Sequence, residues 1–172
     1  NFGFMNGANV EKQSFHAHVT SYDYGAPLTE WGDPSPSYQP YHKVLEKHLG
    51  LAPIPPAVPV VCKGFGTIEL TESVPLWDVL DDLSKSHQSV SPLPMEEYNQ
   101  DYGFILYRTY LSGPRDEAVL TLHGVHDRAQ VFLDGDQIAV LERETGEDSV
   151  QIEVPSAGAW LDILVENMGR VN

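Results

Sequence analysis

Residues 128–142 read RAQVFLDGDQIAVLE, and this stretch decides the fold class. Two runs of apolar and β-branched residues, 131–133 and 138–141, flank the dipeptide Asp134-Gly135. Asp-Gly readily adopts the positive φ angles of a tight hairpin turn. The pattern therefore predicts two antiparallel strands joined at this dipeptide.

Similar short runs, rich in Val, Ile, Leu and aromatic residues, occur on both sides of this hairpin. Together they predict seven strands, at residues 66–70, 104–111, 118–122, 129–133, 137–141, 150–154 and 160–165. Seven short strands separated by turn residues are typical of an antiparallel β-sandwich or jelly roll. We therefore expect a mainly β fold class, with one short helix at 75–83 that has Trp77 and Leu80 on one side.

A helix is predicted upstream, because apolar and aromatic residues recur every three or four positions between Tyr38 and Leu49. Pro36 suits its first turn, and Gly50 suits the position just after its last residue. Residues 51–60 contain four prolines and predict a semi-rigid linker. We therefore expect two modules, residues 1–50 and 61–172, joined by this linker.

The chain has 25 acidic and 10 basic residues, a formal net charge of -15, and most of this charge lies after residue 50. Such a balance argues against binding to nucleic acid or to an anionic membrane. The single cysteine, Cys62, excludes an internal disulfide and a cysteine-based zinc site. Lack of paired cysteines and of Asn-x-Ser/Thr acceptors favours a bacterial cytoplasmic location, although the compartment stays unassigned.

Three local patterns are candidate sites of chemistry. His16 and His18 are two residues apart, as metal ligands on an extended segment can be, but no third ligand is placed, so we expect neither a metal nor a cofactor. His126-Asp127-Arg128 lacks a partner serine elbow and predicts a local ion-pair network instead. Adjacent acids at 81–82 and 96–97 would point apart, so no catalytic carboxylate pair is identified.

Residues 20–30, TSYDYGAPLTE, concentrate phenols, hydroxyls and a carboxylate in an irregular segment. Aromatic rings can stack on the C–H face of a sugar while polar groups bond its hydroxyls. The alternative is a capped loop whose aromatic side chains fill a core. Composition alone favours the capped loop.

Two sets of motifs resemble one known family. Residues 1–9, NFGFMNGAN, and 20–30 resemble the end of the catalytic barrel in β-galactosidases of glycoside hydrolase family 35. Four later segments look like the first β-domain that follows this barrel: 102–109, 124–129, 140–143 and 161–172. The resemblance keeps the family's order and spacing over nearly the whole chain.

The resemblance implies a fold and an activity. The parent would be a retaining exo-β-galactosidase that removes terminal non-reducing β-D-galactose with a (β/α)8 barrel. Its acid/base and nucleophile Glu would lie upstream, so this chain would hold no catalytic residue and would be inactive alone. By resemblance Tyr24 faces bound galactose, with Tyr22 and Asp23 as supporting residues.

The same resemblance predicts that residues 1–9 are the last barrel strand with its loop and that the helix ending at Leu49 closes the barrel. Residues 61–172 would then form an incomplete, galactose-binding-like β-sandwich. As an interior fragment, the chain would expose strand edges and an apolar helix face. These would be covered by the remainder of the same polypeptide or by a homo-oligomer.

Two alternatives stay open for the β-rich module. It could be a non-catalytic carbohydrate-binding module with Trp77, Trp160 or neighbouring tyrosines as a stacking platform. It could also be a structural domain that packs on the barrel, which is the role we mainly expect of residues 61–172.

Overall fold

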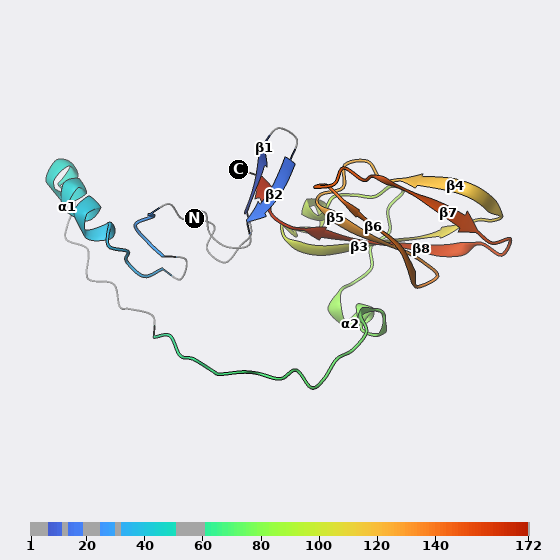
Figure 1. Cartoon of the computed structure of the whole chain (residues 1–172), viewed down its shortest axis with the longest axis horizontal. Helices are drawn as coiled ribbons and strands as arrows, with labels where there is room; N and C mark the ends of the chain where they lie inside the picture. The colour runs from blue at the N-terminus through green and yellow to red at the C-terminus, as the bar shows by residue number, and fades with distance from the viewer. Residues whose placement is uncertain (1–6, 12–13, 19–24, 30–31, 51–60, 172) are drawn as a thin grey trace.

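The computed structural model describes residues 7–11, 14–18, 25–29, 32–50 and 61–171. Figure 1 shows a small sheet of β1, β2 and β9, the separate helix α1, and a larger body formed by strands β3 to β8. We call this larger body, residues 103–167, the β-domain. Among the helices within the described ranges, none has the length and apolar character needed to cross a membrane.

The larger sheet of the β-domain has four antiparallel strands. Their order is β3 (Gly103–Leu111), β8 (Ala159–Asn167), β5 (Arg128–Leu133) and β6 (Asp136–Glu142). The predicted hairpin is confirmed: Asp134 and Gly135 connect β5 to β6 with φ angles of 49° and 92°. Positive φ at both turn positions matches the twist of the flanking strands.

A second layer, formed by β4 (Arg115–Thr121) and β7 (Ser149–Val154), packs over one face of this sheet (Figure 1). The two layers enclose a shared core, because the buried residues of both pack against Leu111, Leu120 and Leu133. The buried apolar residues of these two clusters are Ala129, Val131, Leu141, Ile152, Val154, Ala159 and Leu161. The expectation of mainly antiparallel β-structure is therefore confirmed.

The opposite face of the four-stranded sheet is partly covered by the segment before β3. It contains two helical turns, η1 (Leu76–Asp78) and α2 (Leu80–Leu83), where the sequence predicts a short helix. Trp77 packs edge-on against Phe132 of β5, with ring centroids 5.0 Å apart. A further turn, η2 (Met95–Tyr98), lies just before β3 and buries Met95.

Six of the seven predicted strands form, and the one at 66–70 was wrong. The structure has no strand between residues 61 and 74, and Ile68 and Leu70 are 72% and 90% exposed. Strand propensity largely reflects packing against neighbouring strands. No described strand pairs with this segment, and its β-branched residues alone do not produce a strand.

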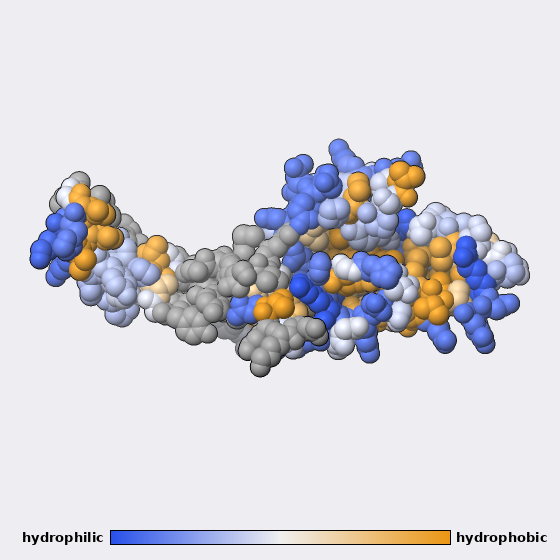
Figure 2. Space-filling view, turned by 90° about the horizontal axis from the view of Figure 1, so that it is seen from above, coloured by the Kyte–Doolittle hydropathy of each residue, from blue (hydrophilic) through white to orange (hydrophobic). Residues whose placement is uncertain are grey.

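Helix α1 (Tyr38–Leu49) confirms the predicted helix. It ends at Gly50, whose φ is 60° and whose N–H donates to the carbonyl of Glu46 at 3.0 Å. Pro40, rather than Pro36, occupies the first turn, where a missing N–H costs nothing. No residue of α1 is buried, and Figure 2 shows hydrophobic side chains exposed along it. The predicted apolar helix face is therefore exposed.

The small sheet was not predicted in this form. Strand β1 (Gly7–Glu11) pairs antiparallel with β2 (Ser14–His18) and parallel with β9 (Arg170–Val171). It therefore joins residues from both predicted modules. Strand β1 overlaps the end of the barrel strand expected at 1–9, while residues 1–6 and the linker at 51–60 lie outside the described residues.

Candidate functional site

The predicted sugar-contacting residues Tyr22, Asp23 and Tyr24 lie outside the described residues. The loop that follows them is described, and it is tied to the segment before α1. The hydroxyl of Ser35 donates to the carbonyl of Ala26 at 2.7 Å, and its N–H donates to the carbonyl of Pro27 at 2.9 Å. These bonds fix the backbone just after the Ser-Tyr-Asp-Tyr motif.

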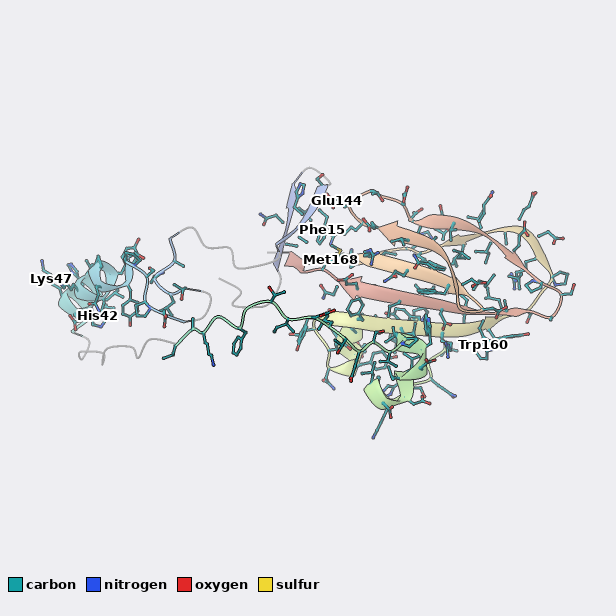
Figure 3. All side chains as sticks on the ribbon, turned by 60° about the horizontal axis from the view of Figure 1, so that its bottom comes forward. Phe15, His42, Lys47, Glu144, Trp160 and Met168 are labelled. Carbon is teal, nitrogen blue, oxygen red and sulfur yellow. The ribbon has the colours of Figure 1, made fainter. Side chains whose placement is uncertain are left out.

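Asp127 is the centre of a polar network at one end of the β-domain, and only 3% of it is exposed. Its carboxylate accepts hydrogen bonds from Nη1 of Arg143 at 3.1 Å and from the N–H of Met168 at 2.8 Å. The guanidinium of Arg143 lies 4.7 Å from the ring centroid of Phe15, on β2. Figure 3 labels Phe15 and Met168 where the small sheet meets the β-domain. The network therefore stabilises this junction.

The predicted ion-pair network around 126–128 is confirmed only in part, because its partners come from elsewhere in the chain. Arg128 pairs with Glu142 at 3.0 Å and Glu166 at 3.7 Å, not with Asp127. Successive residues of a strand point to opposite sides, so neighbours in sequence rarely pair. His16 is exposed on β2, and the described part of the chain holds no cluster of three or more side chains suited to a metal.

A pocket of about 360 Å³ lies on the face of the four-stranded sheet turned away from β4 and β7. We call it the outer-face pocket; its lining residues are Trp77, Arg108, Asp134, Gly135, Trp160 and Asp162. Strands β3 and β8 bring Arg108 opposite Asp162 and Tyr110 opposite Trp160. A spacing of two residues puts these side chains on one face of the sheet, while Leu161 points into the core.

Asp162 and Arg108 form the polar base of the outer-face pocket. The Asp162 side chain is 3% exposed, and Arg108 binds it with Nε at 2.6 Å and Nη2 at 3.0 Å. The hydrogen bonds to Asp162 raise the pKa of Arg108 above its usual value. Burial of the guanidinium lowers this pKa, but the negative charges of Asp162 and nearby Asp81 raise it further. The guanidinium therefore stays charged, and it lies 5.8 Å from the ring centroid of Trp77.

Trp160 forms one wall of the outer-face pocket and is 50% exposed. Its ring packs edge-on against Tyr110 at 5.4 Å. Its backbone is tied to the hairpin turn, since its N–H donates to Oδ1 of Asp134 at 2.8 Å and its carbonyl accepts the N–H of Asp134 at 2.9 Å. Figure 3 shows Trp160 at the end of the β-domain far from Phe15.

The structure thus brings together Trp77 and Trp160, the two tryptophans that the sequence indicated, although they lie far apart in the chain. Sequence reasoning missed Arg108, Asp162 and the contribution of Asp134. A signal for Arg108 and Asp162 was present in the sequence. Each lies two residues from an aromatic residue in a predicted strand, Tyr110 and Trp160 respectively, and residues at that spacing share one face of a strand.

A larger cavity of about 800 Å³ lies on the core-side face of the four-stranded sheet, where residues 92–96 and 121–127 also line it. Its walls include Ile105, Ile163 and Val165 from the four-stranded sheet. At its edge, the hydroxyl of Tyr107 donates to the carbonyl of Leu93 at 2.8 Å. Burial raises the pKa of Tyr107, and the charges of Tyr98 and Glu96 raise it further. The second layer contributes only Thr121 of β4 to the described lining, so it covers this end of the core incompletely.

Two family models match the chain in succession. The model described as glycosyl hydrolases family 35 matches residues 1–48, and the model described as β-galactosidase, first all-beta domain, matches residues 92–172. The second match includes all of the β-domain. The first match includes the Ser-Tyr-Asp-Tyr motif and most of α1.

Similar full-length proteins occur in bacteria and animals. A β-galactosidase of Xanthomonas manihotis is 38% identical over 99% of this chain and 28% of its own length. A β-galactosidase-1-like protein of Mus musculus is 40% identical, and a β-galactosidase of Homo sapiens 42% identical, over 100% of this chain and 27% and 25% of their own lengths. The chain thus spans about a quarter of the relatives that it matches. It belongs to the β-galactosidases of glycosyl hydrolase family 35, of which it comprises the end of the catalytic domain and the first all-beta domain.

Proposed function

We propose that the chain is part of a retaining exo-β-galactosidase that hydrolyses terminal non-reducing β-D-galactose. The observation that carries this proposal is the order of the two family matches, together with 38–42% identity to relatives over essentially the whole chain. A retaining glycosidase needs a nucleophilic carboxylate and an acid/base carboxylate about 5 Å apart. We place both outside these 172 residues, on earlier strands of a (β/α)8 barrel.

Within this mechanism, Tyr24 would bind and orient galactose near the nucleophile, with Tyr22 and Asp23 holding it in place. An oriented phenol hydroxyl can donate a hydrogen bond to the sugar, and accurate positioning lowers the barrier for attack. The anchoring of Ala26 and Pro27 by Ser35 supports this role, because it fixes the backbone two residues after Tyr24.

We further propose that residues 1–50 complete the barrel and that residues 51–60 link the barrel to the next domain. Residues 61–172 would form that domain, a galactose-binding-like β-sandwich or jelly roll. The gap between the family matches, which end at 48 and resume at 92, supports two units. The incompletely covered end of the core, where the larger cavity lies, would leave room for further strands of the parent polypeptide. The main role of the β-domain would be to support the barrel.

The purified 172-residue chain is expected to show no hydrolysis of a chromogenic β-galactoside, because the reacting carboxylates would be missing. Release of nitrophenol can be followed by absorbance at high protein concentration. Turnover that disappears when one carboxylate within the chain is replaced would contradict the proposal.

Tyr24 can be tested in a segment exchange, in which this chain replaces the matched quarter of the Xanthomonas manihotis β-galactosidase. The exchanged enzyme is expected to hydrolyse the β-galactoside, and Tyr24→Phe to lower its kcat/KM by about tenfold or more. Tyr102→Phe is the matched control, since Tyr102 is 65% exposed and lies just before the β-domain. Equal losses for both variants, or a folded but inactive exchange enzyme, would contradict the assignment.

A further inference from the structure

The outer-face pocket combines a flat aromatic wall with a rigid polar base. Trp160 is half-exposed, so part of its ring offers apolar surface to solvent. Trp77 contributes a second ring from a segment far away in the chain. A volume of about 360 Å³ falls within the range of about 300–1,000 Å³ that small-molecule pockets occupy.

The polar groups of the outer-face pocket are held before any ligand arrives. The guanidinium of Arg108 has five N–H groups, and Nε and Nη2 each donate a hydrogen bond to Asp162. The other N–H groups can donate to a ligand or to water. Asp134 uses Oδ1 to accept the N–H of Trp160, and its other carboxylate oxygen is available as an acceptor at the exposed turn. Preorganised donors and acceptors bind a ligand with little loss of side-chain freedom.

The charge of the outer-face pocket restricts the ligand. Arg108 is surrounded by Asp162, Asp134 and the nearby Asp81, so carboxylates outnumber the one guanidinium. The chain as a whole carries a formal net charge of -15. An anionic ligand is therefore disfavoured relative to an uncharged one.

We propose that the outer-face pocket binds an uncharged pyranose saccharide. The C–H face of the sugar packs on Trp160, while its hydroxyls accept from Arg108 and donate to Asp134. Pyranose rings present one apolar face and a rim of hydroxyls, which is the combination that these side chains recognise. This binding function belongs to the β-domain with the segment before β3, and it does not depend on the proposed hydrolase activity.

The test uses the full 172-residue chain with lactose and cellobiose as neutral probes and galacturonate as an anionic probe. Calorimetry is expected to give a millimolar dissociation constant for a neutral probe and weaker binding of galacturonate. Trp160→Ala should weaken the binding about tenfold, and Tyr102→Ala, at a more exposed aromatic residue, should leave it unchanged. Far-UV circular dichroism checks that each variant is folded.

A second measurement follows binding on the unsubstituted chain, and variants serve only to assign its signals. In ¹H–¹⁵N spectra of the unsubstituted chain, the indole N–H signals of Trp77 and Trp160, assigned with Trp→Phe variants, should move as a neutral saccharide is added. Saturable binding that leaves both signals in place would overturn the proposal, and so would absence of binding at the highest probe concentration. Equal or tighter binding of galacturonate would overturn the choice of an uncharged ligand.

Discussion

An Arg143→Met variant is expected to lower the free energy of unfolding of the 172-residue chain by about 3 kcal/mol. Arg143 is the cation that binds the carboxylate of Asp127, whose side chain is 2% exposed. Removing it leaves a buried charge whose remaining hydrogen-bond donor, among the described residues, is the N–H of Met168. It also removes the contact with Phe15. Urea denaturation followed by circular dichroism measures the loss.

Arg128→Met is the matched control. Arg128 pairs with Glu142 and Glu166, whose side chains are 39% and 33% exposed, so water can replace the lost ion pairs. Its loss should cost about 1 kcal/mol or less. Adding Asp127→Asn to Arg143→Met should recover part of the stability, because the buried charge is then gone. Similar losses for the two arginine variants would show that burial of Asp127 does not decide the effect.

Gly113→Ala is expected to destabilise the β-domain by about 3 kcal/mol. A Cβ at Gly113 would collide with the carbonyl oxygen of Pro155, and it would lie 3.2 Å from the carbonyl oxygen of Val154. The Pro155 carbonyl is held in place because it accepts the N–H of Gly158 at 2.8 Å in the turn between β7 and β8. The clash is therefore with fixed backbone rather than with a movable side chain.

Gly64→Ala serves as the control for this substitution. Gly64 is exposed, and apart from its two chain neighbours no described residue has a heavy atom within 4 Å of the position that a Cβ would take. Its replacement should change the free energy of unfolding by about 0.5 kcal/mol or less. A Gly113→Ala variant that unfolds at the same urea concentration as Gly64→Ala would contradict the close approach of Gly113 to Pro155.

The elements that the sequence predicted well are those whose signals are local. The β5–β6 hairpin depends on Asp134-Gly135, and α1 depends on a periodic apolar face that ends at Gly50. The segment expected as a strand at 66–70 had the right residue types, but no described strand pairs with it. The pairing of β1 with β9 was not predicted, because it joins residues near opposite ends of the sequence.

The sites show the same division. The sequence indicated Trp77 and Trp160 as candidate binding residues from their type alone. It did not indicate Arg108 or Asp162, because their meeting depends on the register of β3 against β8. The sequence also did not indicate Arg143 as the partner of Asp127. Arg143 follows β6, and its separation from Asp127 along the chain does not predict that the two side chains meet. Tyr22, Asp23 and Tyr24 remain predictions from the family motif.

The parallel pairing of β1 with β9 has a consequence for the order of folding. It matches Gly7 with Arg170, so nearly the whole chain forms the loop that this pairing closes. The entropy lost on closing a loop grows with its length, whereas the β5–β6 hairpin closes across a single turn. The hairpin can therefore form early, and β9 can join β1 only after the intervening strands have collapsed. The Asp127 network then receives Met168 and Phe15 as a late step that couples the two ends of the chain.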